Sequence, residues 1–166
     1  MGTIIAKQNY KILANAANPT EVPTQSCNCN NKENCPLEGH CLKKNVVYQT
    51  TLTQEDGKVE NYVGLTAQTF KKRWDGHTNS FRNEDYSTET ALSIHIWNLK
   101  RENIGYNLKW KVISRASPFS SISGRCNMCT EEKLFIIYHP QLASLNQKNE
   151  LFIHCRHKTS MLLDKT

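Results

Sequence analysis

The feature that most constrains this chain is a polar turn between two short segments rich in β-branched and aromatic residues. The tripeptide VVY at 46–48 precedes the turn, the dipeptide DG occupies 56–57, and the tripeptide YVG at 62–64 follows it. Asp-Gly between two such segments is the strongest short-range indication of a β-hairpin. Pairing of the two strands is expected to bring the phenols of Tyr48 and Tyr62 together at one end of a sheet.

The hydrophobic pattern of the remaining chain predicts an α+β fold. Residues 108–113 alternate between apolar and polar side chains through most of their length, which indicates a half-exposed strand. A small, mainly antiparallel three-stranded sheet flanked by helices is therefore expected. Strands are predicted at 46–53, 62–65 and 108–114, helices at 69–80, 88–101, 130–139 and from about Gln147, and a serine-rich loop at 118–124.

Length and composition limit the chain to one folded domain with a modest appendage. Residues 1–26 are expected to be a linker, because Pro19 and Pro23 interrupt helix formation. Residues 27–44 form a cysteine-rich knuckle in this interpretation, and residues 45–166 form the globular domain. The chain contains no apolar run long enough to span a bilayer and no signal peptide, so a soluble, intracellular protein is expected.

An excess of basic residues favours a polyanionic partner. The 21 Lys and Arg residues outnumber the 15 Asp and Glu residues, which gives a formal charge of +6. A solvated basic surface is an equally common explanation of such a charge, so the charge alone does not identify the partner. The lysines expected near the tyrosine strands are the candidate nucleic-acid contacts, namely Lys71, Lys72, Lys109 and Lys111.

The helix expected at 69–80 adds two polar groups to the two phenols. Phe70 and Trp74 form one apolar stripe, with Arg73 and His77 four residues apart along its edge. A guanidinium, an imidazole and two phenols can therefore converge. The structural alternative is that the tyrosines are ordinary cross-strand aromatics and His77 a hydrogen-bonded histidine at the core margin.

The order of these parts resembles the GIY-YIG nuclease family. The tripeptide at 46–48 stands in place of the family's first tripeptide and the one at 62–64 in place of its second. The chain departs from the family at Val46, where a glycine usually opens the first strand. Arg73 and His77 fall where the family keeps an arginine and a following polar residue, and Glu132 and Asn146 match its later acid and amide.

A nearly full-length set of sequence blocks is similar to the endonuclease module that ends the polyprotein of Penelope-like retroelements. No part of the chain resembles the reverse transcriptase that normally precedes this module. The chain is thus an excised module, a truncated copy or a stand-alone descendant. The blocks are CPL at 35–37, Gly39, CL at 41–42, LS at 92–93, HIW at 95–97, CNMC at 126–129, EK at 132–133 and CRH at 155–157.

The resemblance implies a Mg²⁺- or Mn²⁺-dependent enzyme that nicks duplex DNA to expose a 3′ hydroxyl for target-primed reverse transcription. Tyr48 would accept a proton from the attacking water, and Tyr62 would orient the water or the phosphate. Arg73 would bind phosphate oxygens through its fork of donors. A nuclear protein is expected, with element RNA and a reverse transcriptase as further partners.

The resemblance also assigns roles to three residues outside the strands. Glu132 would hold the divalent metal, with Glu131 as the fallback, whereas the structural alternative is that both acids cap the start of their helix. That helix is apolar almost all round and is expected to pack between the sheet and other helices. His77 would assist proton transfer or hold the phosphate, and Asn146 would tether a loop or contact the active-site backbone.

The seven cysteines occur in tight groups, which predicts metal binding in a reducing compartment rather than a disulfide framework. Cys27, Cys29, Cys35 and Cys41 can close a tetrahedral zinc site, with His40 as an alternative fourth ligand. The segment is too short and polar to fold by hydrophobic burial alone. It is expected to contact DNA or RNA rather than to support catalysis.

A second zinc site is predicted from two segments that are distant in sequence. It combines Cys126 and Cys129 with Cys155 and His157, and His154 can replace either member of the second pair. Buried structural thiols are the alternative, and cross-pairing with the first group is open. A zinc ion there would link two helices and fix the position of the metal-binding carboxylate.

Two other functions fit the same sequence. One is a catalytically inactive, zinc-stabilised nucleic-acid-binding domain from a decayed element. The other is a structural protein–protein module, which would show no salt-sensitive affinity for DNA.

Overall fold

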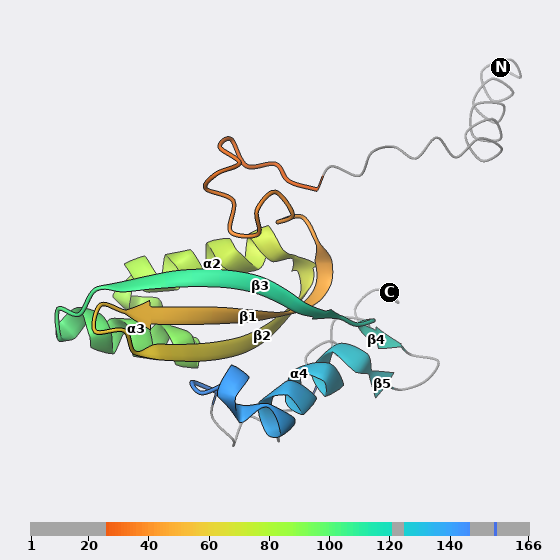
Figure 1. Cartoon of the computed structure of the whole chain (residues 1–166). Coiled ribbons are helices and arrows are strands. Elements are labelled where there is room, and N and C mark those ends of the chain that lie inside the picture. Colours follow the sequence, from red (N-terminus) through yellow and green to blue (C-terminus); the bar gives the residue numbers. More distant parts are fainter. Residues whose placement is uncertain (1–25, 121–124, 147–154, 156–166) are drawn as a thin grey trace, which may run out of the picture.

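A three-stranded antiparallel sheet in the order β2-β1-β3 forms the centre of the protein (Figure 1). The structure is a computed structural model that describes residues 26–120, 125–146 and 155. The expected α+β fold with a small antiparallel sheet is confirmed. Nearly all of the linker expected at 1–26 and the helix expected from Gln147 lie outside the described residues. The strands are β1 (Lys44–Gln54), β2 (Val59–Thr69) and β3 (Tyr106–Arg115).

The predicted turn joins β1 to β2. Gly57 has a φ of +86°, a conformation that glycine adopts without strain, and its N–H donates to Gln54 O over 3.0 Å. Asp56 Oδ1 accepts from Lys58 N at 2.8 Å. β2 extends well beyond the predicted 62–65, because its pairing with β1 continues as far as Thr69.

The helices begin at residues whose side chains satisfy free backbone donors. Helix α2 (Phe70–Arg82) follows Thr69, whose side chain accepts from Lys72 N. Helix α3 (Ala91–Arg101) follows Thr90 in the same way and therefore begins later than the predicted residue 88. Within the described part of the chain, no helix has the length and hydropathy needed to cross a bilayer.

Two residues of the predicted serine-rich loop form a strand. β4 (Phe119–Ser120) pairs with β5 (Arg125–Cys126) in a separate two-stranded sheet. β5 leads directly into helix α4 (Asn127–Tyr138), which begins three residues earlier than expected. A short 3-10 turn, η1 (Glu84–Tyr86), follows α2, and another, η2 (Pro140–Leu142), follows α4.

The two faces of the sheet bury separate apolar clusters. Alternation along β1 places Val46 and Tyr48 on the face covered by α2 and α3, and Val47 on the face covered by α4 (Figure 1). Val46, which stands where the resembling family has glycine, is fully buried in the first cluster. The valine therefore contributes apolar burial to the core at this position.

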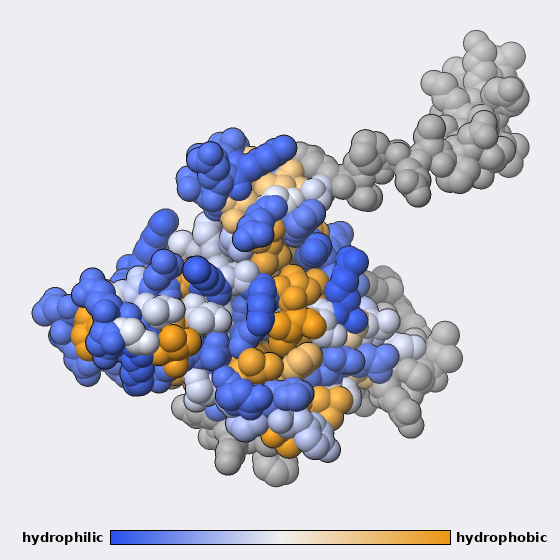
Figure 2. All heavy atoms as spheres, in the orientation of Figure 1, coloured by the Kyte–Doolittle hydropathy of each residue, from blue (hydrophilic) through white to orange (hydrophobic). Residues whose placement is uncertain are grey.

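In the described part of the chain helix α4 packs mainly on the sheet and η2, and the prediction that it lies between the sheet and other helices is not confirmed there. Ile136 packs against the sheet, whereas Leu134, Ile137 and Tyr138 are exposed. Hydrophobic residues are visible among hydrophilic ones over this helix in Figure 2. Within the described residues, α4 packs mainly on β1, β2 and η2, which explains the one-sided burial.

Candidate functional site

Tyr48 on β1 and Tyr62 on β2 lie on the same face of the sheet as diagonal neighbours. The strand register pairs Tyr48 with Gly64 and Tyr62 with Thr50. A Cβ atom at Gly64 would lie 2.5 Å from the Tyr48 hydroxyl and 3.0 Å from the Tyr62 ring. The glycine of YVG thus lets the Tyr48 phenol pass close to the β2 backbone. Glycine in a strand interior is typical of such a close approach.

Arg73, on the second turn of α2, lies close to both phenols. Its Nε donates to the Tyr48 hydroxyl at 3.0 Å, and the Tyr62 phenol is close enough to raise its pKa. Burial lowers the pKa of Arg73, but the two phenols outweigh it and leave the pKa above its ordinary value. The guanidinium has five N–H donors, so donors remain for an anion after these contacts.

His77 lies deep in the core, 2% exposed, and holds the Tyr48 hydroxyl from the other side. Tyr48 Oη and His77 Nε2 are 2.8 Å apart. Burial, and after it the charge of Arg73, lowers the pKa of His77 to about 3, so the imidazole is neutral near pH 7. A neutral Nε2 accepts the Tyr48 proton, and the Tyr48 oxygen accepts from Arg73.

These contacts change the expected role of two residues. Tyr48 is fully buried, and burial, together with the nearby charge of Glu132, raises its pKa although Arg73 opposes the shift. A neutral, enclosed phenol is poorly placed to take a proton from water. His77 has almost no exposed surface with which to hold a phosphate, so we assign it the positioning of Tyr48.

The titration of His77 predicts a loss of stability in acid. The unfolded chain takes up the proton near the ordinary pKa of 6.5, whereas the folded chain does so only near 3. Between these values the unfolded state binds more protons, so the free energy of unfolding falls as pH falls, by up to about 1.4 kcal/mol per pH unit. Urea unfolding between pH 7.5 and 4.5 measures this slope.

The variant His77→Gln keeps a hydrogen-bond acceptor for Tyr48 but cannot titrate, so its stability should depend less steeply on pH. The exposed His139 provides the matched control, since His139→Gln should retain the wild-type slope. Identical slopes for wild type and both variants would contradict the assignment of a neutral, buried His77.

Two adjacent acids on α4 have different surroundings. Glu131 Oε2 accepts from Ser114 Oγ at 3.0 Å. Glu132 is half-buried, and its charge is close enough to raise the pKa of Tyr48. Because α4 begins at Asn127, no acid lies in its first turn, and the alternative that both acids cap the helix start is wrong.

Glu132 is the acid that the resemblance assigns to a divalent cation. Among the described residues, the only groups of three or more close potential ligands consist of cysteines. One carboxylate, completed by water and substrate phosphate oxygens, is the ligand set that Mg²⁺ commonly takes in proteins. Glu132 as the metal ligand therefore stays a prediction, and Glu131 is hydrogen-bonded to Ser114.

Asn146 fastens β2 at its outer edge. Its Oδ1 accepts from Val63 N and its Nδ2 donates to Val63 O, both at 2.8 Å. Val63 lies between Tyr62 and Gly64 in the chain, so the amide holds the backbone that carries the second phenol. Asn146 thus contacts the β2 backbone next to Tyr62.

The four candidate lysines do not gather on one surface. Lys71 and Lys72 lie at the start of α2, on the tyrosine side of the sheet, and Lys71 Nζ contacts Asn28 Oδ1 at 2.9 Å. Lys109 and Lys111 are exposed on β3 and alternate with apolar residues that face the tyrosines. They therefore lie on the opposite face of the sheet.

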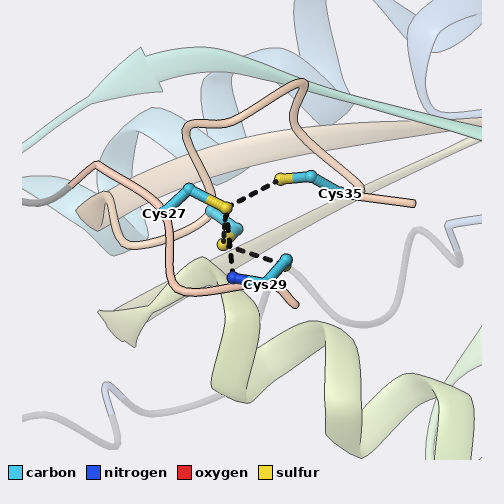
Figure 3. A group of neighbouring side chains, drawn as sticks. Cys27, Cys29 and Cys35 are labelled. Atoms are coloured by element: carbon cyan, nitrogen blue, oxygen red, sulfur yellow. Dashed lines mark hydrogen bonds between the residues drawn. The ribbon is translucent and has the colours of Figure 1, made fainter. Parts of the chain in front are cut away.

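The first cysteine group has the geometry of a tetrahedral thiolate site. The Sγ atoms of Cys27, Cys29, Cys35 and Cys41 lie within 4.8 Å of one another, and the side chains labelled in Figure 3 converge. The closest Sγ pairs are 3.5 to 3.7 Å apart. Four sulfurs around Zn²⁺ at about 2.3 Å are about 3.8 Å apart. The group fits a structural zinc ion, and His40 is exposed and outside it.

Backbone hydrogen bonds favour the thiolate of Cys35, whereas burial raises the pKa of Cys29 and Cys41. Burial raises the pKa of Cys35, but hydrogen bonds from the backbone of Leu37 and Gly39 outweigh it and bring the pKa to about 7. Gly39 has a φ of +89°, which glycine adopts without strain. Cys29 N also donates to Cys27 Sγ at 3.3 Å.

The second cysteine group lies at the start of α4. The Sγ atoms of Cys126, Cys129 and Cys155 lie within 4.8 Å of one another, with Cys129 and Cys155 at 3.5 Å. The candidate fourth ligands, His157 and His154, lie outside the described residues. All seven cysteines are free thiols and form two separate groups, so they show no cross-pairing.

Comparisons with known proteins gave no match among protein-family models, curated proteins or solved structures. The interpretation of the site therefore depends on its own geometry. In that geometry Arg73 of α2 bonds to Tyr48 of β1 and lies near Tyr62 of β2, and the charge of Glu132 on α4 acts on Tyr48.

Proposed function

We propose that this protein is a divalent-metal-dependent DNA endonuclease that hydrolyses phosphodiester bonds at a GIY-YIG-like site. The observation that carries the proposal is the hydrogen bond from Arg73 to Tyr48, with Tyr62 close enough to act on the pKa of the same guanidinium. A guanidinium fixed in this way has its charge and its remaining donors pre-oriented for a phosphate. The neighbouring carboxylate of Glu132 provides a place for a cation beside that phosphate.

The two tyrosines have different roles in this proposal. Tyr62 retains 7% exposure and lies near Arg73, so its hydroxyl is the one that meets the attacking water or the phosphate. Tyr48, with no exposed surface, fixes Arg73 through its hydroxyl. The resemblance alone gave the proton-accepting role to Tyr48, and its burial is the reason for reversing that assignment.

Glu132 would hold Mg²⁺, or Mn²⁺ in its place. When bound, such an ion supplies a Lewis acid that stabilises charge on the leaving oxygen. Arg73 binds the non-bridging phosphate oxygens and stabilises the charge that develops there. Water adds to phosphorus, the bond from phosphorus to the 3′ oxygen breaks, and the leaving oxygen gains a proton to become a 3′ hydroxyl.

The proposed substrate is duplex DNA, nicked to leave a 3′ hydroxyl from which a reverse transcriptase can extend. Element RNA and the polymerase that copies it are the proposed partners, and chromosomal DNA as the target places the enzyme in the nucleus. The zinc ion at Cys27, Cys29, Cys35 and Cys41 is structural in this proposal. The rival function is a zinc-stabilised nucleic-acid-binding domain without catalysis.

Supercoiled plasmid distinguishes these functions. Purified protein should convert the plasmid to nicked circles with Mg²⁺ or Mn²⁺ and should not do so with EDTA. Fluorescence anisotropy with a labelled duplex at two salt concentrations reports binding, which should weaken at the higher salt. Binding without nicking in either metal would favour the rival function. If the protein neither nicks the plasmid nor binds DNA in a salt-sensitive way, the protein–protein module is the remaining interpretation.

A further inference from the structure

The cysteine-rich knuckle, residues 27–44, lies against the first turn of α2 (Figure 1). Phe70 N donates to Lys43 O and Lys71 N donates to Cys41 O, each at 2.8 Å. The first N–H groups of a helix have no partner within the helix and need acceptors elsewhere. Two backbone carbonyls of the knuckle serve that purpose here, and one of them belongs to a residue of the thiol group.

Side chains reinforce this contact. Lys71 Nζ contacts both the side-chain oxygen of Asn28 at 2.9 Å and its backbone carbonyl at 3.4 Å. Leu37 is buried in the same apolar cluster as Val46 and Phe70. The knuckle therefore holds the start of α2 through backbone, polar and apolar contacts together.

Apart from backbone hydrogen bonds in its turns, the knuckle has little to keep its shape. Its buried residues are Cys35, Leu37 and Cys41, two of which are members of the thiol group. A segment with so little apolar burial depends on its metal for a fixed conformation. The position of the Cys41 carbonyl, and with it the start of α2, then depends on whether the thiol group is closed.

We propose that a zinc ion at Cys27, Cys29, Cys35 and Cys41 sets the position of α2 and thereby controls phosphate binding by Arg73. Arg73 lies on the next turn of the helix whose first residues bond to the knuckle. A shift of about 1 Å in such a group costs about a hundredfold in rate. This inference, which rests on the proposed nuclease function, assigns the knuckle to support of the active site rather than to DNA contact.

The double variant Cys27→Ser/Cys29→Ser tests the inference, with Asn30→Ser/Asn34→Ser as a matched control on exposed knuckle residues. Elemental analysis should find about two zinc ions per wild-type chain if both thiol groups bind, and one fewer in the cysteine variant. The amide protons of Phe70 and Lys71 should exchange at least tenfold faster in that variant. Plasmid nicking should fall about a hundredfold, whereas the control should match wild type.

A second experiment compares the zinc-bound and zinc-free states without mutation. A chelator removes zinc from the wild-type protein, and zinc is then returned. Circular dichroism should show that most secondary structure persists without zinc, while nicking is lost and then recovered. Loss of the whole fold on zinc removal would overturn a local coupling between knuckle and α2. So would zinc loss that leaves the Phe70 and Lys71 amides protected, or a protein that contains no zinc and has freely titratable thiols.

The failure of the proposed function gives a different pattern. If wild-type protein never nicks DNA, but the two amides still lose protection with zinc, the nuclease proposal is wrong and the coupling of the knuckle to α2 is retained. If nicking occurs and is indifferent to zinc, the coupling is wrong and the nuclease proposal is retained.

Discussion

Arg73→Ala should lower the kcat/KM of plasmid nicking by about a hundred- to a thousandfold, because it removes a pre-oriented donor from the charge that develops in the transition state. Arg73→Lys should be almost as impaired. Lysine keeps the charge, but it lacks the planar fork that bonds to Tyr48 beside Tyr62.

Lys72→Ala is the matched control, since it removes a positive charge from the exposed residue directly before Arg73 in the same helix. It should change nicking by less than about tenfold, with the loss confined to KM and larger at low salt. Equal losses in Lys72→Ala and Arg73→Ala would mean that the general basic field, and not the placed guanidinium, is what matters. Urea unfolding of each variant separates these effects from lost stability.

Gly64→Ala should abolish most nicking and destabilise the fold by about 1 to 3 kcal/mol, the range for forcing extra atoms into a packed core. The new Cβ would lie 2.5 Å from the Tyr48 hydroxyl and 2.7 Å from the ring carbon that bears it. Tyr48 must move, and it is bonded to Arg73 and His77. One methyl group thus disturbs three members of the site.

Gly76→Ala provides the control for Gly64→Ala. A Cβ at Gly76 meets no atom within 4 Å, and Gly76 is exposed on α2. Alanine should therefore stabilise the helix by about 0.5 to 1 kcal/mol and leave nicking intact. Tyr48→Phe removes the nearest clashing atom, so its combination with Gly64→Ala should be less than additive in stability. Full activity in Gly64→Ala would contradict the close packing described above.

Local sequence chemistry predicts the parts of this fold that depend on neighbours in the chain. Asp56 and Gly57 indicate the hairpin, and the alternation of residues 108–113 indicates β3. The spacing of Arg73 and His77 places both side chains toward Tyr48. The same alternation also shows that Lys109 and Lys111 must face away from the tyrosines, although all four lysines were expected near the tyrosine strands.

Contacts between distant segments could not be read from the sequence. The capping of α2 by the carbonyl of Cys41 involves a backbone atom, which no side-chain pattern reports. The one-sided burial of α4 depends on how many elements cover its face of the sheet. Asn146 pairs with Val63 across more than eighty positions, and only the family resemblance indicated a role for it. Tyr48 is fully buried because side chains of α2 and β3 pack around it.

The central claim is that Tyr62, Arg73 and Glu132 face one phosphate. The most direct test is a crystal structure of the wild-type protein bound to duplex DNA with Ca²⁺, an oxygen-binding cation, in place of Mg²⁺. The account predicts one backbone phosphate within about 3 Å of the Arg73 guanidinium, the Tyr62 hydroxyl beside it, and the cation between that phosphate and Glu132. DNA lying across Lys109 and Lys111, with no phosphate at Arg73, would contradict it.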